Sequence, residues 1–182
     1  MKMKTYIALF RGINVGKSNR LTMKDLAAVI QSAGCQNVRT YVQSGNAVFE
    51  SGEEDTARIS HLISSETQKR HGFEPQVLVL KPGELKKAMA DNPFPEGESE
   101  PQTLHLGFLA STPKSPDLKA LENLRSGKER FRLQGKIFYL HAPDGVGRSR
   151  LAAGAEKWLG VAMTDRNWKT VSELARMVDE VK

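Results

Sequence analysis

Thr5-Tyr-Ile-Ala-Leu-Phe10 is an apolar run that leads directly into Arg11-Gly-Ile-Asn-Val-Gly-Lys-Ser-Asn-Arg20. The run is apolar on both faces, which predicts a central β-strand over residues 3–10. An amphipathic stretch opens at Thr22, so the second segment is a basic, glycine-punctuated loop between a strand and a helix. Such a loop brings backbone N–H groups and cationic side chains together, which suits an anion. The pattern does not identify the anion.

The residues that follow continue as alternating strands and helices. Thr22 fits a helix N-cap with Asp25 as its capping-box acid, and Gly34 is a natural helix end. Beyond that helix we expect, in order, strands over 38–42 and 47–49 around a turn at 43–46, a helix over 54–70 and a strand over 75–80. The resulting order, βαββαβ, is typical of the ferredoxin-like split βαβ arrangement.

The remainder of the chain nearly repeats this order. The patterns predict a helix over 84–91, a polar break at 92–101, a strand over 103–109, a helix over 116–124, strands over 130–133 and 136–141, and helices over 148–159 and 165–181. We therefore expect an α+β protein with two ferredoxin-like halves, residues 1–81 and 82–182. The second half lacks its last strand in this interpretation and ends in two helices. The sequence leaves open whether the halves form one compact unit.

A sheet order of 4-1-3-2 in the first half has a direct consequence for function. With right-handed crossovers, the end of the first strand, the turn between the second and third strands, and the entry to the fourth strand share one edge of the sheet. Residues 11–20, 43–46 and 71–74 should therefore meet in space. This is the main structural expectation from the sequence.

Composition sets broad limits on function. The chain has 182 residues and a net charge of +6, from 27 Lys and Arg against 21 Asp and Glu. This excess permits an acidic partner such as nucleic acid or a phosphorylated metabolite, although a solvated surface is its commoner meaning. No apolar run approaches the roughly 18 residues that span a bilayer, and the N-terminal run is too short for a signal peptide. We expect a cytoplasmic protein that does not enter a membrane.

The residues that usually build metal or redox sites are sparse. A single cysteine, Cys35, excludes an internal disulfide and a cysteine-built metal site, and its position favours a buried small hydrophobe over a nucleophile. None of the four histidines has metal-ligand spacing with another candidate ligand, so no metal is expected. No nucleophile elbow, catalytic triad or paired carboxylate stands out, which counts against an enzyme without excluding one.

The segment Gly12–Ser18 invites comparison with the P-loop, G-x-x-x-x-G-K-[ST]. The match fails because Arg11 occupies the position of the first glycine, and because three residues separate Ser18 from the helix cap at Thr22. No later strand ends in an Asp suited to hold Mg²⁺. An NTPase is therefore not favoured. A shorter anion-binding nest and a purely structural loop remain as alternatives.

Three further segments carry polar groups that serve either a turn or a ligand. Gln43, Ser44 and Asn46 surround Gly45, where a structural turn is the simpler interpretation and ligand orientation the alternative. Arg148 precedes a predicted helix, whose free N–H groups would add to its charge. Arg166 and Asn167 adjoin Trp168, for which core packing is favoured. The βαββαβ order also fits an RNA-recognition domain, but its aromatic K/R-G-F-type octamer is missing.

Several motifs together resemble a known family. They are Arg11-Gly-Ile-Asn-Val-Gly16, Met23-Lys-Asp-Leu26, Thr40-Tyr-Val-Gln-Ser-Gly-Asn46, Gly147-Arg-Ser149 and Thr164-Asp-Arg-Asn-Trp168. In this order they resemble the uncharacterised bacterial domain-of-unknown-function family 1697, over nearly the whole chain. The resemblance implies an α+β protein with two ferredoxin-like halves, and no activity, substrate or cofactor. The family's usual motif has a second glycine where this chain has Lys17, which demotes the P-loop comparison further.

The leading hypothesis is a cytosolic protein that binds a phosphate- or carboxylate-bearing ligand, with no catalytic residue or cofactor assigned. Charge would come from arginine and lysine, anion contacts from backbone amides, and orientation from uncharged polar side chains. The predicted ligand-binding residues are Arg11, Gly12, Asn14, Gly16, Lys17, Gln43, Ser44, Asn46, Arg148, Arg166 and Asn167. The alternatives are a nucleic-acid-binding module and a structural or protein-interaction domain.

Overall fold

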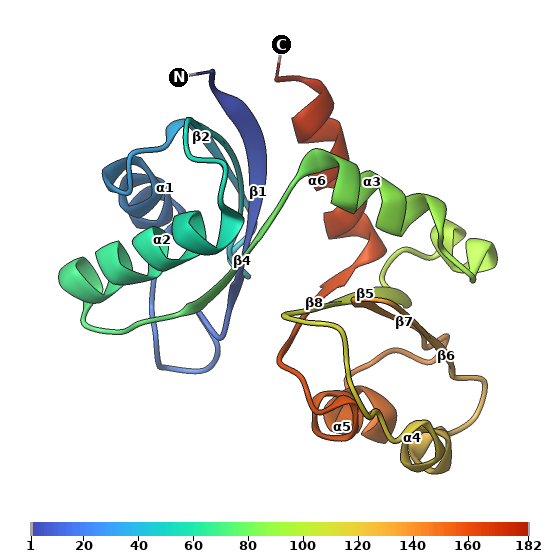
Figure 1. The fold of residues 1–182 in the computed structure, drawn as a ribbon. Helices are drawn as coiled ribbons and strands as arrows, with labels where there is room; N and C mark the ends of the chain where they lie inside the picture. The colour runs from blue at the N-terminus through green and yellow to red at the C-terminus, as the bar shows by residue number, and fades with distance from the viewer. Residues whose placement is uncertain (1, 182) are drawn as a thin grey trace. The chain divides into compact units, whose positions relative to one another are not determined.

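The computed structural model describes residues 2–181, which fold as two compact units. The first unit comprises the residues up to Lys87 and those from Glu173 onward, and the second comprises Ala88–Ser172. The elements in chain order, drawn in Figure 1, are β1 (Lys4–Arg11), α1 (Met23–Ser32), β2 (Gln36–Tyr41), β3 (Asn46–Ser51), α2 (Thr56–His71), β4 (Gln76–Leu80), α3 (Pro82–Ala90), the short 3₁₀ helix η1 (Pro95–Ser99), β5 (Leu104–Leu109), α4 (Leu118–Leu124), β6 (Arg130–Gln134), β7 (Ile137–His141), α5 (Arg150–Leu159), β8 (Met163–Asn167) and α6 (Trp168–Asp179).

The sheet of the first unit has four antiparallel strands in the order β2-β3-β1-β4. This confirms the order expected from the sequence. β1 lies in the middle, where Tyr6 faces Phe49 of β3 and Ala8 faces Val79 of β4. Both faces of β1 are buried from Tyr6 to Phe10, which explains its unbroken apolar run.

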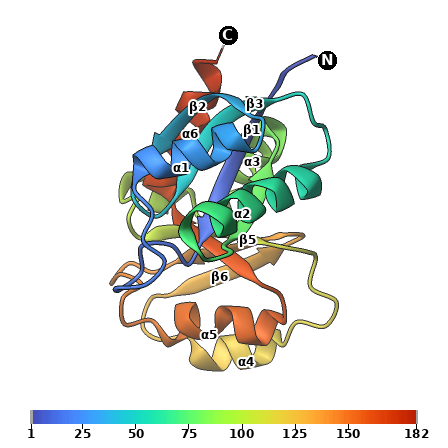
Figure 2. The same cartoon turned by 90° about the vertical axis from the view of Figure 1, so that its left-hand side faces the viewer.

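α1 and α2 cover one face of this sheet (Figures 1 and 2). Each helix begins at a side-chain cap: the Thr22 hydroxyl accepts from the Asp25 amide, and the Asp55 carboxylate accepts from the Ala57 and Arg58 amides. α2 ends at Gly72, which takes the left-handed conformation at φ 77°. The buried core between these layers contains Tyr6, Phe10, Leu26, Ile30, Phe49, Ile59 and Ile63, with Tyr6 stacked on Phe49.

The second unit repeats this topology without any residue-level repeat. Its strands follow the order β6-β7-β5-β8, again antiparallel, and α4 and α5 pack on one face (Figure 2). Two ferredoxin-like halves are therefore confirmed. The structure also places residues from Glu173 to the end of α6 with the first unit, where Arg39 donates to Glu180 at 2.7 Å.

The expectation that the second half lacks its last strand is wrong. β8 pairs with β5 along its whole length, and Thr164 and Arg166 point inward while Asp165 is exposed. Its polar residues hide this alternation of period two, because β8 is an edge strand with one neighbour. The final helix consequently begins at Trp168, not at residue 165, and the Asn167 side chain caps it by accepting from the Thr170 amide at 3.0 Å.

Two buried tyrosines provide a matched test of the packing. The Tyr6 hydroxyl is buried and has no hydrogen-bond partner among the described residues, whereas the Tyr139 hydroxyl donates to the Ala88 carbonyl at 2.7 Å. An unsatisfied buried hydroxyl costs free energy, so Tyr6→Phe should raise the free energy of unfolding by about 1 kcal/mol. Tyr139→Phe should lower it by about 1 kcal/mol. Urea unfolding of both variants checks this, and equal effects of the same sign would contradict it.

Candidate functional site

The loop between β1 and α1 has an alternating backbone. Gly12, Asn14 and Gly16 have positive φ angles of 73°, 55° and 60°, while Ile13 and Val15 between them keep negative ones. An alternation of left- and right-handed residues turns successive N–H groups toward the same side of the chain and forms an anion-binding nest. The loop has the alternating φ signs of such a nest, and the Asn14 amide in its middle donates to the Asn19 carbonyl.

Asn14 holds this loop in place. Its side-chain amide donates to the Leu21 carbonyl at 2.7 Å and to the Gln43 carbonyl at 2.9 Å, and its Oδ1 accepts from the Leu21 amide at 2.9 Å. The Asn14 backbone amide also donates to the Asn19 carbonyl at 3.0 Å, and Asn19 Nδ2 donates to the Gly12 carbonyl at 3.2 Å. One side chain thus joins both ends of the loop to the β2–β3 hairpin.

The hairpin meets the loop at Gly45. Its carbonyl accepts from the Phe10 amide at 2.8 Å, and a Cβ added there would lie 2.5 Å from Ile13 Cδ1. Only glycine fits, both for this close approach and for its φ of 87°. Together with the contact between Asn14 and Gln43, this confirms that residues 11–20 and 43–46 meet. We call residues 11–20 and 42–46 the rim.

β4 brings the third expected segment to the same edge. Gln76 begins β4 immediately after the 71–74 loop and pairs with Arg11, the last residue of β1. Arg11 Nη1 donates to Gln76 Oε1 at 2.7 Å. Phe73, inside that loop, packs against the core beneath α1 and α2. All three segments therefore lie at one edge of the first sheet, as the sequence predicted.

The cations of the rim differ in their surroundings. Arg11 is partly buried and bonded as described, whereas Lys17 and Arg20 are exposed and make no ion pair with any residue in the range 2–181. Arg20 lies in the basic loop but outside the set of residues predicted to bind. The sequence could have indicated the position of Arg20 beside the nest, because Arg20 belongs to the same basic segment, residues 11–20.

The uncharged members of the predicted set divide into two groups. Gln43 and Ser44 are exposed at the tip of the hairpin. Asn46 is fully buried in β3, where its side-chain amide donates to the Tyr41 carbonyl at 3.0 Å and to Ser44 Oγ at 3.1 Å. Asn46 thus closes the hairpin turn, as the simpler interpretation held.

The remaining predicted residues belong to the second unit. Arg148 is exposed in the loop before α5, whose N-cap is Ser149. Arg166 is buried on β8 and donates to the Asp165 carbonyl at 2.7 Å; burial lowers its pKa to about 10. Asn167 is the cap of α6. Within their unit, Arg166 and Asn167 therefore have structural partners, and Arg148 faces solvent.

Sequence reasoning missed two apolar residues of the rim. Val15 is 69% exposed, and Val42 is 43% exposed with a positive φ of 48°. A β-branched residue rarely adopts this conformation, which costs about 1–3 kcal/mol where it occurs. No sequence pattern indicated it, because the strain at Val42 arises from the register of the hairpin.

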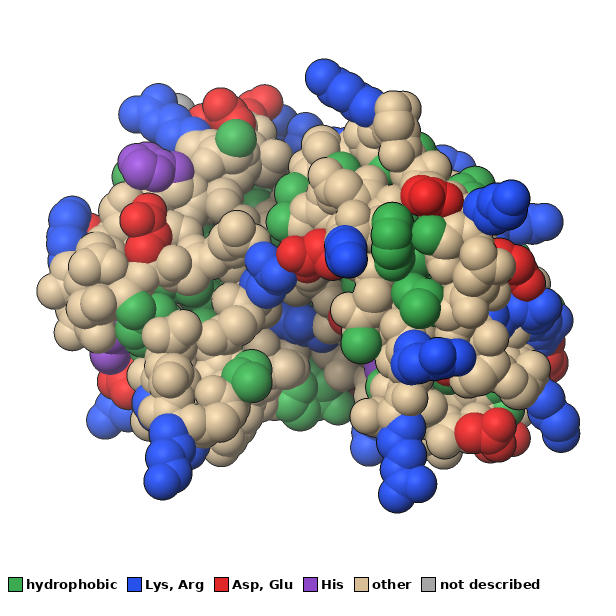
Figure 3. Space-filling model, turned by 90° about the horizontal axis from the view of Figure 1, so that it is seen from below, with side chains coloured by type: hydrophobic (Ala, Val, Ile, Leu, Met, Phe, Trp, Pro, Cys, Tyr) green, Lys and Arg blue, Asp and Glu red, His purple; other side chains and the backbone are tan. Residues whose placement is uncertain are grey.

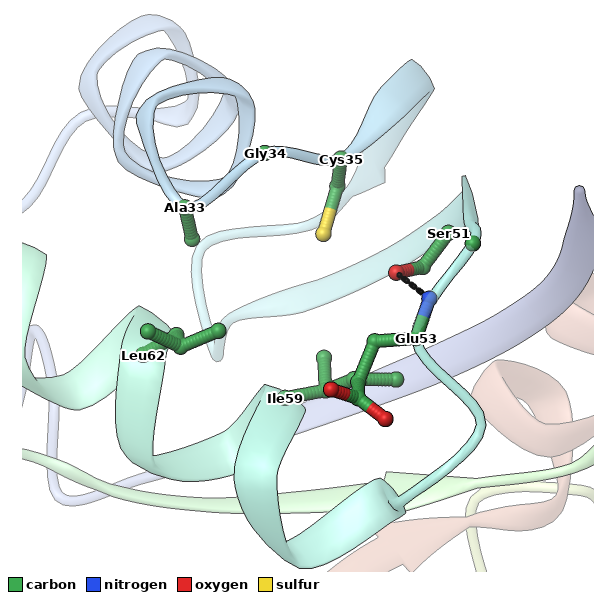
Figure 4. Close-up of a pocket in the computed structure, with 8 residues that line it drawn as sticks. Ala33, Gly34, Cys35, Ser51, Glu53, Ile59 and Leu62 are labelled. Atoms are coloured by element: carbon green, nitrogen blue, oxygen red, sulfur yellow. Dashed lines mark hydrogen bonds between the residues drawn. The ribbon is translucent and has the colours of Figure 1, made fainter. Parts of the chain in front are cut away.

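A separate pocket of about 280 Å³ lies elsewhere in the first unit (Figure 4). It lies where α1 ends, between the end of β3 and α2, and Cys35 lines it. Burial raises the pKa of the Cys35 thiol to about 11, against a smaller opposing effect of the Ser51 hydroxyl. Cys35 is buried as expected, but the pocket was not predicted, because its walls come from three separate segments.

One imidazole is held between two acceptors in the second unit. His105 Nδ1 lies 2.7 Å from Asp165 Oδ2 and its Nε2 lies 3.1 Å from the Gln102 carbonyl. Burial alone would lower the pKa of His105, but the hydrogen bond and charge of Asp165, with the Gln102 carbonyl, outweigh burial and raise it. Both ring nitrogens are occupied, so this pair offers no obvious general base. Among residues 2–181 no group of three or more His, Cys, Asp or Glu side chains is placed to hold a metal ion.

A sequence model of proteins of unknown function, DUF1697, matches residues 3–139. The chain belongs to this family. No functionally curated protein matches it. The structure is similar to that of the conserved bacterial protein SP0830 from Streptococcus pneumoniae, with a TM-score of 0.70 and 21% sequence identity over 97% of this chain and 99% of the other. At this identity the similarity shows a shared fold. No helix within residues 2–181 is long and apolar enough to cross a membrane.

Replacing Asn14 tests its role as the support of the rim. Asn14→Ala removes three side-chain hydrogen bonds, each worth about 1 kcal/mol, and leaves a Cβ in the left-handed region. We expect a loss of about 2–4 kcal/mol in the free energy of unfolding. Asn14→Gly removes the same bonds without the backbone penalty, so it should cost about 1 kcal/mol less than alanine. Chemical denaturation measures both values, and a loss below about 0.5 kcal/mol in Asn14→Ala would contradict the role.

The His105–Asp165 pair predicts a pH dependence of stability. Because the folded-state pKa of His105 is raised, the contribution of the pair is complete below the unfolded pKa of about 6.5 and is lost as the pH rises through the folded value. The free energy of unfolding should fall in that window, by at most about 1.4 kcal/mol per pH unit. Asp165→Asn should flatten the dependence. Urea unfolding across a pH series checks this, and identical slopes for the two proteins would refute it.

Proposed function

We propose that this protein is a cytoplasmic protein that binds a phosphate- or carboxylate-bearing ligand at the rim of its first unit. The observation that supports the proposal is the alternation of φ signs from Gly12 to Gly16, which is a feature of loops whose N–H groups turn toward one side. The sole cysteine of the chain fits a reducing compartment. No reaction is assigned.

The charges around the nest favour an anion. Arg11, Lys17 and Arg20 all belong to the loop that forms it, and no Asp or Glu lies in residues 11–20. Amide donors alone recognise an anion weakly in water, whereas a guanidinium bonded to a phosphate oxygen contributes about 1.5–3 kcal/mol. Arg11 would supply such a contact from the end of β1, with Lys17 and Arg20 adding charge from solvent.

The support of the loop favours binding without rearrangement. The Asn14 side chain donates to the Leu21 carbonyl and the Asn19 side chain to the Gly12 carbonyl, so hydrogen bonds within the loop hold its shape. A site that is already formed loses little conformational entropy when the ligand arrives. The phosphate or carboxylate group of the ligand would then accept hydrogen bonds from the loop amides that point outward.

A nucleic-acid-binding module is less well supported. RNA-recognition domains of this topology bind on the open face of the sheet. Here the corresponding faces are closed: Ile7, Leu9 and Val48 of the first sheet, and Leu106, Phe108 and Tyr139 of the second, are at most 2% exposed. On the face drawn in Figure 3, lysine and arginine side chains are interspersed with acidic ones and do not merge into one continuous stripe.

Calorimetric titration with inorganic phosphate, at constant ionic strength set with chloride, tests the proposal. Arg11→Ala should weaken phosphate binding by about tenfold to a hundredfold, since each tenfold corresponds to about 1.4 kcal/mol. Lys17→Gln and Arg20→Gln, at exposed positions that leave the fold intact, should each weaken it by a smaller factor. Lys69→Ala, on α2 and paired with Glu66, removes the same charge elsewhere and should leave binding unchanged.

Three outcomes would contradict the proposal. Binding that is equal in the Arg11→Ala and wild-type proteins would remove the rim as the site. A steep fall of affinity for a short RNA with rising salt, without phosphate binding, would favour the nucleic-acid alternative, because phosphate contacts release counterions. No binding of either probe would favour a structural or protein-interaction role.

A further inference from the structure

The pocket of about 280 Å³ in the first unit has walls from three elements (Figure 4). The connection from α1 to β2 contributes Ala33, Gly34 and Cys35; the end of β3 and the turn after it contribute Ser51, Gly52 and Glu53; and α2 contributes Ile59 and Leu62. Its size is close to the lower limit for small-molecule sites, about 300 Å³. Only a small organic ligand is of a suitable size for such a pocket.

One side of the pocket is apolar and reaches solvent. Ala33, Ile59 and Leu62 form this side. Leu62 is 38% exposed, one of the few large hydrophobic side chains in the described chain that are not buried. A leucine exposed on the wall of a concavity, rather than on a convex helix face, gains from covering by a hydrocarbon group.

The other side of the pocket carries acceptors and negative charge. Ser51 Oγ accepts from the Glu53 amide at 3.1 Å. Glu53 Oε1 accepts from the amides of Glu54 and Asp55 at 2.9 and 3.0 Å, which aligns the carboxylate at the pocket wall (Figure 4). Glu53 Oε2 is 3.2 Å from Arg58 Nε, in a pair whose arginine is 69% exposed and which is therefore weak.

The charges of the pocket select a cation. Glu53 carries the sole formal charge among the lining residues at neutral pH, since the Cys35 thiol is protonated there and no lysine or arginine lines the pocket. α1 ends at the pocket and has no basic residue in its last turn. The negative end of its helix dipole therefore adds to the negative potential of the Glu53 carboxylate. The formal charge of the lining residues is therefore negative, in contrast to that of the rim.

We propose that this pocket binds a small organic ammonium ligand. The ammonium group would donate hydrogen bonds to the Glu53 carboxylate and to Ser51 Oγ, while the hydrocarbon body would lie on Ile59 and Leu62. The proposal does not depend on the anion site at the rim, because it uses other residues and the opposite charge.

Three probes of one shape and different charge test the proposal. Cyclohexylammonium, cyclohexanol and cyclohexanecarboxylate are titrated into the full chain labelled with ¹⁵N and ¹³C, and amide and methyl signals are followed by NMR. Cyclohexylammonium should shift the signals of residues 33–35, 51–53, Ile59 and Leu62 in a saturable manner. It should bind at least about tenfold more tightly than the carboxylate, as expected for a charged hydrogen bond. Equal affinity of the two, or no shift in these signals, overturns the proposal.

Two isosteric variants separate the pocket from its surroundings. Glu53→Gln keeps an oxygen that accepts from the turn amides and should reduce cyclohexylammonium affinity by about tenfold. Glu54→Gln, a neighbouring residue that pairs with Lys4 and does not line the pocket, should leave it unchanged. Leu62→Ser, at a partly exposed position, should weaken all three probes. If Glu53→Gln and Glu54→Gln change the cyclohexylammonium affinity equally, the assignment of Glu53 fails. This outcome is independent of whether phosphate binds at the rim.

Discussion

The side chain of Asn14 is the interaction on which the rim depends. The loop has few backbone hydrogen bonds of its own, chiefly that from the Asn14 amide to the Asn19 carbonyl, so side chains must help to fix its shape. Asn14 does this by bonding to both sides of the gap, to Leu21 at the start of α1 and to Gln43 in the hairpin. Asparagine is also suited to the left-handed conformation that the position requires. The same residue therefore sets the backbone alternation and connects the two segments that form the rim.

Much of this arrangement could be predicted from the sequence, because it follows from topology. The apolar run of β1, the glycine at the hairpin and the βαββαβ order together determine that residues 11–20 and 43–46 share an edge. β8 could not be recognised in the same way. As an edge strand it buries Thr164 and Arg166 instead of aliphatic residues, and its neighbour Trp168 starts a strongly amphipathic helix that dominates the pattern.

The site was harder to predict than the fold, for two physical reasons. Side chains such as Asn46 look like ligand donors in a sequence but are used by the turn itself, because buried amides must find partners. Conversely, the pocket beside Cys35 uses ordinary residues, Ser51, Glu53 and Leu62, that carry no motif. Only the packing of α1 against α2 and the end of β3 brings them together.

The first unit thus has two proposed binding surfaces of opposite charge. At the rim, Lys17 and Arg20 face solvent, and Val42 keeps a strained conformation with a φ of 48°. At the pocket, the end of α1 and Glu53 present acceptors beside an apolar wall. The four-stranded sheet supports both surfaces, so each is held by a rigid element instead of a free loop.

The most direct measurement of the central claim is the position-resolved response of the backbone amides to inorganic phosphate. If the loop is a formed anion nest, the amide protons of Ile13 and of residues 15–17 should move downfield together and saturate with one dissociation constant, whereas the Asn14 amide, which donates to the Asn19 carbonyl, should move less. Phosphate that binds elsewhere while these amides stay unchanged would contradict the account.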